Sequence, residues 1–423
     1  MSSFFGLWKL VLRSLRQHLL STCVTVVSVA LATGLVMGVF AVSQQSRMAF
    51  AGGPLGFNAV VGARGSQLQL VLNTVFHLET SPGNVPWSLY EELKEDKRVE
   101  LALPFALGDN YAGFRIVGTT PEVFGPFEYE KGAPFTFQPG GRAFDPRRRE
   151  IVIGASVAQV TGLRVGDHVN PSHGVEVNRV EDHVHDEEFV VCGILNPTHS
   201  PNDRVLWLPL EGVYRMSGHR LRGTGAEYEP KDGVAIPDEH KELSAVLLKL
   251  VGRGSGFQLA TKYNRLGKEA TFAWPIGAVM AQLFEKLGWM ASILEIVAYL
   301  VMVVAAASIL ASLYNTMNER RREFAILRAL GARRSTVFTV ILLEAEAIAL
   351  GGSLLGFGVL AGILAGAAQI VREKTGVVID PFVLHPAYLW TPLGMMALGG
   401  LAGLLPALKA YATDVAETLS GGS

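Results

Sequence analysis

The sequence is poor in charge and in cysteine. Only 18% of its 423 residues are charged, whereas a typical soluble domain has about a quarter. Its two cysteines lie in unlike surroundings, Cys23 in an apolar run and Cys192 in a polar region, so a disulfide framework is excluded. The net charge of −1 provides no overall attraction to nucleic acid. We therefore expect no nucleic-acid partner.

The sequence also lacks the local motifs of several enzyme classes. It contains no G-x-x-x-x-G-K-[ST] phosphate loop, no G-x-S-x-G and no H-E-x-x-H. These absences argue against an ATPase site, a hydrolase nucleophile and this kind of metalloprotease within these residues. We expect no catalytic residue and no cofactor in this chain, apart from the metal hypothesis below.

Long apolar runs, in contrast, are abundant. Four of them reach the about 20 residues that a helix needs to cross a bilayer. The first run is longer than the apolar core of a secretory signal, about 7–15 residues, so an anchored helix is expected. The predicted spans are residues 19–43, 285–314, 336–371 and 388–411.

Basic residues predict the orientation of these spans. Lys9, Arg13 and Arg16 precede the first span, and six arginines lie between the second and the third. Because Lys and Arg favour the cytoplasmic ends of spans, we expect a multi-pass protein of the bacterial inner membrane with both termini in the cytoplasm. The predicted cytoplasmic segments are residues 1–18, 315–335 and 412–423, and the outer segments are 44–284 and 372–387.

Residues 1–18 place apolar and basic side chains on different faces of a helix. One interpretation is an amphipathic helix lying on membrane lipids. The alternative is a simple cytoplasmic extension of the first span. The pattern leaves both open.

The outer segment 44–284 alternates short β-rich runs with short helical runs, which is typical of an α+β domain. Its two ends resemble outward continuations of the neighbouring helices and predict a stalk. The expected fold class is therefore an integral membrane α-helical protein with four transmembrane helices and a large α+β extracytoplasmic domain between helices 1 and 2.

Glycines recur at a spacing of four in the last two spans. Such spacing lets helix backbones approach closely, within one chain or across a dimer. The predicted helix-packing positions are Gly352, Gly356, Gly358, Gly362, Gly366, Gly399 and Gly403. Acids also occur in the spans, at Glu295, Glu344 and Glu346; they lie at the membrane interface or couple to protons, and the sequence leaves both readings open.

Histidines are concentrated between residues 168 and 199. The segment EDHVHDEE places His183 and His185 on one face of a strand, if a strand forms. Imidazoles beside carboxylates suit zinc, so these two residues are the candidate metal ligands. The alternative is a solvated polar loop that binds no ion.

The segment NERRREFAILRALGARRS, residues 318–335, predicts a short helix between the second and third spans. Asn318 is the expected N-cap, and Gly331 is a natural helix stop. Its apolar residues suggest a docking face for a cytoplasmic partner, whereas its arginines are also explained as a topology signal. Both interpretations hold together.

This segment and the span after it, down to GGSLLGFGVLAG, closely resemble the permease domain shared by macrolide exporter, lipoprotein-releasing and FtsX-like ABC transporter subunits, the type VII mechanotransmission family. The layout of one span, a large outer domain and three spans is similar over essentially the whole chain. The resemblance implies a separate cytoplasmic ABC ATPase that carries ATP and Mg, and a homodimer or heterodimer of permeases. The ATPase-docking residues that it implies are Glu319, Arg322, Glu323, Phe324, Leu327, Arg328 and Gly331.

The leading functional hypothesis is an ABC permease subunit, itself no enzyme, that exports or extracts a lipoprotein, peptide or lipid-like amphiphile. One alternative is a non-transporting mechanotransmission scaffold that regulates an envelope enzyme or sensor through a periplasmic partner. Another is a zinc-linked envelope transport or binding protein.

Overall fold

The computed structural model describes residues 2–51, 56–174, 184–231, 234–267, 269–378 and 383–412. The chain forms two compact units. The helical unit comprises Met1–Ser46, Leu287–Gln369 and Asp380–Ser423, and the sheet unit comprises Arg47–Lys286 and Ile370–Ile379.

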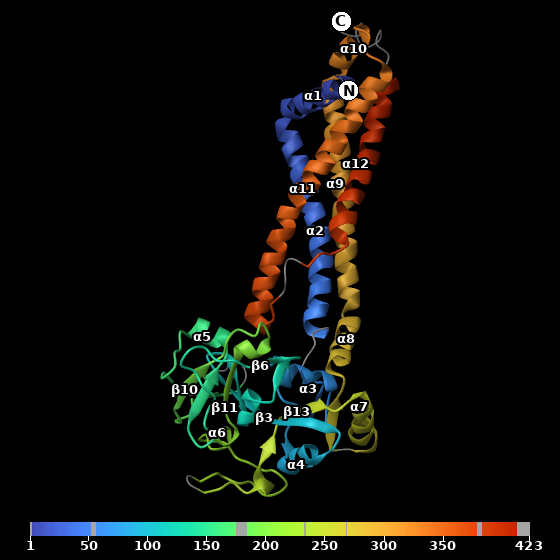
Figure 1. Cartoon of the computed structure of the whole chain (residues 1–423). Helices are drawn as coiled ribbons and strands as arrows, with labels where there is room; N and C mark the ends of the chain where they lie inside the picture. Colours follow the sequence, from blue (N-terminus) through green and yellow to red (C-terminus); the bar gives the residue numbers. More distant parts are fainter. Residues whose placement is uncertain are drawn as a thin grey trace. The chain divides into compact units, whose positions relative to one another are not determined.

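Long apolar helices build the helical unit (Figure 1). A helix satisfies most of its backbone groups internally, which is what a bilayer requires. Among the described residues, four helices are long and apolar enough to cross a membrane, at Leu19–Phe50, Gly288–Glu319, Arg334–Thr375 and Ala387–Ala412. The helices are α1 (Ser2–Gln17), α2 (Leu19–Ala51), α9 (Gly288–Glu319), α10 (Arg321–Ala329), α11 (Arg334–Thr375) and α12 (Ala387–Ala412), with the last residues of α2 and α11 counted in the sheet unit.

Apolar side chains from the four long helices meet in one cluster, which includes Val29 of α2, Ile309 of α9, Ala349 of α11 and Met395 of α12. Glycine permits this close packing at four of the predicted positions. A Cβ added at Gly352 would lie 2.4 Å from Val29 Cγ1, and each of the other three would also meet a neighbouring helix: Gly356, Gly399 and Gly403.

The other three predicted glycines differ. A Cβ added at Gly358, Gly362 or Gly366 would meet no atom of the described residues within 4 Å. None of these positions therefore makes a close helix contact within the described part of the chain. The α11 segment packs through Gly352 and Gly356 alone among the predicted sites on that helix.

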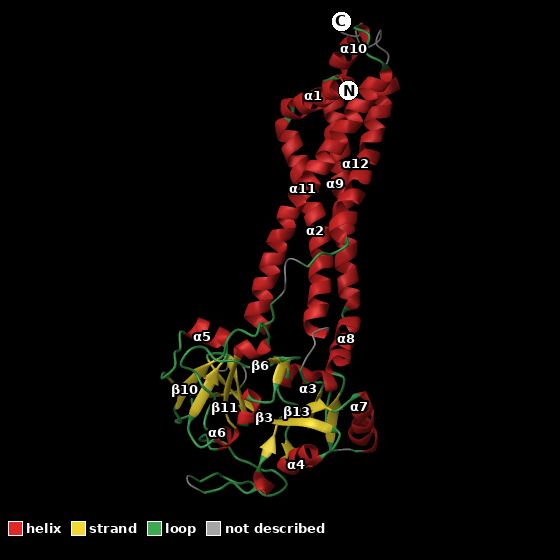
Figure 2. Ribbon diagram, in the orientation of Figure 1, coloured by secondary structure: helices red, strands yellow, loops and turns green. Residues whose placement is uncertain are grey.

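The sheet unit is α+β, as Figure 2 shows. Its described strands form a ten-stranded mixed sheet in the order β14-β1-β13-β3-β4-β11-β7-β10-β8, with β9 beside β3. The long strand β3 pairs with β13 through its first half and with β4 through its second, so it joins the two halves of the sheet. The expected fold class, four membrane helices with a large α+β domain between the first and second, is confirmed.

The main sheet consists of strands β1 (Ala59–Ala63), β3 (Val99–Tyr111), β4 (Phe114–Thr119), β7 (Glu150–Ile153), β8 (His168–Val169), β9 (Ser172–His173), β10 (Phe189–Ile194), β11 (Val205–Pro209), β13 (Ala245–Leu250) and β14 (Ala270–Ala273). Two small sheets pair β2 (Val85–Pro86) with β12 (Glu242–Leu243) and β5 (Glu128–Glu130) with β6 (Ala133–Pro134). The helices of this unit are α3 (Gln67–Thr74), α4 (Trp87–Glu95), α5 (Ala155–Thr161), α6 (Leu210–Tyr214), α7 (Arg253–Ala260) and α8 (Ile276–Lys286).

Both faces of the sheet are covered. Along β11, Leu206 and Leu208 join one apolar cluster, whereas Val205 and Trp207 join another, as the two-residue repeat of a strand requires. Residues of α4 to α7 pack in the first cluster, and residues of α3 and α8 pack in the second. The strand ends and the loops, rather than the sheet faces, are therefore the places where polar sites can form.

Candidate functional site

The first candidate site is α10, the short helix between α9 and α11. The expected N-cap, Asn318, lies inside α9 instead, and Arg320 precedes α10 without a side-chain cap. Gly331 ends the helix with a φ of +102°, which a residue with a side chain rarely adopts. The backbone N–H groups of Gly331 and Ala332 donate to the carbonyls of Arg328 and Leu327, a Schellman-type stop.

The two faces of α10 differ in polarity and burial. Phe324 is buried, 8% exposed, against α9, α11 and α12 residues that include Met317, Ile341 and Ala407. In contrast, Ile326, Leu327 and Leu330 are exposed. An apolar surface on a short helix of this kind is a candidate contact for another protein.

Arg320 fixes α10 to its neighbours. Its Nη1 donates to Glu344 Oε1 of α11 at 3.1 Å, and its Nε donates to Glu323 Oε2 at 3.2 Å. The same guanidinium also contacts the hydroxyl of Ser14 in α1 and lies over the Phe324 ring. Two other helices, α1 and α11, therefore hold the start of α10 in place.

The structure divides the residues expected to dock an ATPase. Arg322, Glu323, Leu327 and Gly331 are exposed, as a docking surface requires. Phe324 is not: it belongs to the apolar interior of the helical unit, because the helix turns this side chain toward α11. Glu319 lies at the end of α9, where His18 Nδ1 approaches its carboxylate at 3.2 Å, and Arg328 is half-buried. A charge at Phe324 would disrupt packing and is no clean test of docking.

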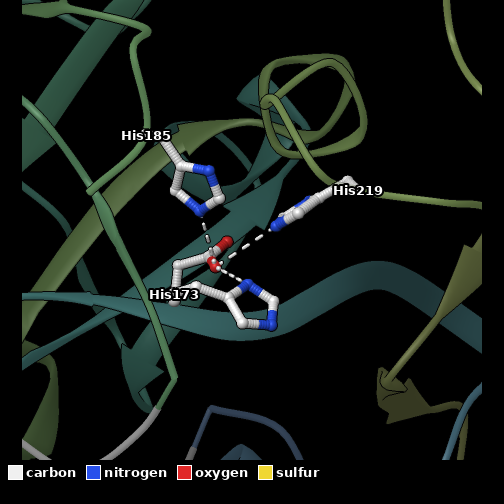
Figure 3. Close-up of side chains that lie close together, drawn as sticks. His173, His185 and His219 are labelled. Carbon is white, nitrogen blue, oxygen red and sulfur yellow. Dashed lines mark hydrogen bonds and ion pairs between the residues drawn. The ribbon is translucent and has the colours of Figure 1, made fainter. Parts of the chain in front are cut away.

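The second candidate site lies in the sheet unit, where three histidine rings converge on one carboxylate oxygen (Figure 3). Asp109 Oδ1 lies 3.2 Å from His173 Nδ1, 3.3 Å from His185 Nε2 and 3.3 Å from His219 Nε2. One ligand atom from each of the four residues falls within 4.8 Å of all the others. This is the geometry of a candidate metal centre.

Four separate segments supply these residues. Asp109 is near the end of β3, His173 ends β9, His185 follows the bridge at Val184, and His219 lies after α6. Asp109 is 1% exposed, whereas the His173 side chain is 60% exposed. A hollow of about 430 Å³ lined by Asp109, His173 and His219 leads to the cluster.

Burial and hydrogen bonding act in opposite directions on this cluster. Burial raises the pKa of Asp109, but the three histidines outweigh it and hold that pKa well below its usual range. The Asp109 carboxylate raises the pKa of His173. Burial lowers the pKa of His185, but Asp109, with the Ser217 carbonyl and Glu187, outweighs this effect and raises it. Asp109 is therefore an anion, and one of its oxygens faces all three rings.

Sequence reasoning found only part of this cluster. His185 is one of the two expected ligands, and His183, the other, lies outside the described residues. Asp109 and His219 were missed because they are far from the histidine-rich segment in sequence, and His173 was missed although it lies within that segment. The only local signal was an acid, Asp109, at the end of the apolar strand-forming run 101–108.

Comparisons with known proteins match both parts of the chain. The family model described as "MacB-like periplasmic core domain" matches residues 22–246, more than half of the chain. The model described as "FtsX-like permease C-terminal" matches residues 295–415. The two matches together include most of the sheet unit and the helices that follow it.

Curated relatives share a shorter region. The macrolide export ATP-binding/permease protein MacB of Shigella sonnei (strain Ss046) is 30% identical over 156 residues, 37% of this chain and 23% of that protein. Its counterpart from Escherichia coli (strain K12) is 29% identical over the same shares. Each alignment thus spans less than a quarter of the relative's own length.

A solved structure also matches: the periplasmic region of MacB from Actinobacillus actinomycetemcomitans aligns with 55% of this chain and 94% of that one, at 12% identity and a TM-score of 0.33. The family assignment depends on the sequence models, which agree with the order of one membrane helix, a large domain and three membrane helices. The chain belongs to the family of FtsX-like, MacB-type ABC transporter permeases.

Proposed function

We propose that this permease transmits the energy of ATP hydrolysis, carried out by a separate ATPase subunit, to movement of the sheet unit. In this proposal α10 and both termini face the cytoplasm of an inner membrane, and the sheet unit lies outside. Two permease chains, alike or different, act with two ATPase subunits. The work serves export or extraction of an amphiphile such as a lipoprotein, a peptide or a lipid-like molecule.

The observation that carries this proposal is the construction of α10. Its inner face is anchored by Phe324 and by the Arg320–Glu344 ion pair, while Leu327 and Leu330 remain exposed. A force applied to the outer face would reach α1, α9 and α11 through these contacts. An anchored helix with an exposed apolar face suits a subunit that pushes, since a loose loop would absorb the movement.

The test is purification of the full-length tagged protein from its native host in mild detergent. We expect an ABC ATPase to accompany it near one-to-one. Leu327→Asp should abolish that association, because an unpaired charge in an apolar contact is costly. Val251→Asp, which places the same charge at an exposed valine of the sheet unit, is the matched control and should retain the ATPase.

The outcomes separate the hypotheses. An ATPase retained by Leu327→Asp would remove α10 as the docking helix. Absence of any ATPase from the wild-type preparation would overturn the coupling proposal. ATP turnover in reconstituted vesicles without movement of any amphiphile would favour the non-transporting mechanotransmission scaffold.

A further inference from the structure

We propose that Asp109, His173, His185 and His219 form a binding site for a divalent transition-metal ion, with Zn²⁺ as the ion that the ligand set suits best. The site lies in the sheet unit. It is independent of the proposed coupling function, because none of its residues belongs to α10 or to the helical unit.

The first support is the identity of the ring nitrogen that carries the proton in His185 and His219. His185 Nδ1 lies 2.9 Å from the carbonyl oxygen of Ser217, and His219 Nδ1 lies 2.7 Å from that of Val213. A carbonyl oxygen only accepts, so each Nδ1 must carry the proton. In a neutral ring the Nε2 lone pair then points outward, toward Asp109.

Two such lone pairs therefore face an ionised carboxylate oxygen, which also only accepts. Neutral rings leave three acceptors directed at one another, unless a cation lies between them. Protonating both rings would place two positive charges on imidazoles whose centroids are 4.9 Å apart. A bound metal ion uses both Nε2 lone pairs and the carboxylate at once.

The distances fit such an ion. Zn–N and Zn–O bonds of about 2.0 Å in a tetrahedron place neighbouring ligand atoms about 3.3 Å apart. The three N–O separations at Asp109 Oδ1 are 3.2 to 3.3 Å. Backbone carbonyls that accept from the second ring nitrogen are a recurrent outer shell of metal-binding histidines, and both His185 and His219 have one.

The second oxygen of the carboxylate is consistent with the same site. Asp109 Oδ2 is buried and has no hydrogen-bond partner among the described residues. A buried acceptor without a partner is costly, and an ion at this place would satisfy it. Three imidazoles and one carboxylate favour Zn²⁺ over Mg²⁺ or Ca²⁺, which prefer oxygen ligands.

Access to solvent makes the site exchangeable. His173 is largely exposed and borders the hollow that leads to Asp109. Four protein ligands fill the tetrahedral positions of a structural zinc site, and this set has four, but one of them is open to solvent. We therefore expect an ion that chelators remove without unfolding the sheet unit.

The test uses the full-length protein in detergent, stripped with a chelator and prepared without a histidine tag. Titration with Zn²⁺ should show one saturable site per chain, and Co²⁺ should produce the visible absorption of tetrahedral coordination. His219→Ala and His173→Ala should each weaken Zn²⁺ binding by at least about 100-fold, since a direct ligand matters at least as much as an outer-shell partner. His168→Ala, an exposed histidine outside the cluster, should leave binding unchanged.

His173→Ala keeps the test decisive if the more buried variants fail to fold, because its side chain is mostly exposed. Hydrogen exchange provides a second readout: Zn²⁺ should slow exchange in residues 213–221, which hold His219. The proposal is overturned if the wild type shows no saturable Zn²⁺ binding, or if both ligand variants bind Zn²⁺ as the wild type does.

Discussion

The helical unit and the sheet unit each bury a carboxylate, but they neutralise it differently. Glu344 of the helical unit pairs with Arg320, a permanent cation, and both side chains are at most 10% exposed. Asp109 of the sheet unit instead faces His173, His185 and His219. A guanidinium cannot lose its proton or yield its place to an ion, whereas imidazoles can do both. The Arg320–Glu344 pair suits a permanent contact between helices, whereas the Asp109 cluster suits a site that binds and releases an ion.

Removing one partner of the Arg320–Glu344 ion pair should have the largest effect on stability. Glu344→Gln leaves the buried Arg320 charge with only Glu323, a half-exposed carboxylate, as its ionic partner, which should cost up to about 3–5 kcal/mol of unfolding free energy. Thermal unfolding in detergent, followed by circular dichroism, measures the loss. Glu346→Gln is the control on the same helix, since Glu346 forms no ion pair in the described part of the chain.

The double variant Arg320→Met with Glu344→Leu sharpens this prediction. Replacing a whole buried ion pair by apolar side chains is often neutral, so the double variant should recover most of the stability. Equal stability of Glu344→Gln and the wild type would show that the Arg320–Glu344 ion pair does not stabilise the helical unit.

A matched pair of glycine substitutions tests whether close helix contacts hold the helical unit together. Gly352→Ala places a methyl group 2.4 Å from Val29 Cγ1 and should destabilise the unit by about 1–3 kcal/mol. Gly362→Ala meets no described atom within 4 Å, so it should be neutral or stabilising by up to about 1 kcal/mol through helix propensity. Comparison of their unfolding temperatures decides; loss of stability in Gly362→Ala would indicate that another chain covers this face.

Acid should lower the stability of the sheet unit through His77. The Arg320–Glu344 pair of the helical unit contains no histidine. Burial, together with the positive charge of Arg115, lowers the pKa of His77 from 6.5 to about 3. Between these values only the unfolded chain binds the proton, so stability falls as the pH decreases below 6.5. Because part of the residue stays exposed, the loss from pH 7 to pH 5 should be about 1–2 kcal/mol.

Unfolding of the full-length protein at the two pH values measures this loss. His77→Asn is the control, because asparagine tolerates the φ of +55° at this position and does not titrate. The variant should lose less stability on acidification than the wild type. An equal loss in both proteins would show that other groups cause the acid sensitivity.

Local patterns in the sequence predicted the membrane helices and the short helix between the second and third. Runs of apolar residues such as 19–43 need no knowledge of distant residues, and a glycine stop at Gly331 depends on one backbone conformation. The expected continuation of the first helix beyond its span is present, since α2 runs to Ala51, whereas Asn318 extends α9 instead of starting α10. Helix ends depend on packing as well as on local signals.

The direction of single side chains was harder to predict. Phe324 and Leu327 are three residues apart and equally apolar, yet only Phe324 is turned into the interior. Gly352 and Gly362 belong to two runs with the same spacing of four but out of step by two residues, so they point in different directions on α11, and only the first meets a neighbouring helix within 4 Å. Periodicity identifies a face, but the neighbouring helices decide which part of that face is covered.

The sequence by itself determined the four membrane spans, the α+β character of the domain between them and the family of the chain, since all three depend on residues close together in sequence. Only the tertiary structure decided the two polar centres. Ser14 meets Arg320 across 306 positions, and Asp109 meets His185 across 76. Such contacts depend on how distant strands and helices pack, and no local pattern of charge or spacing encodes that packing.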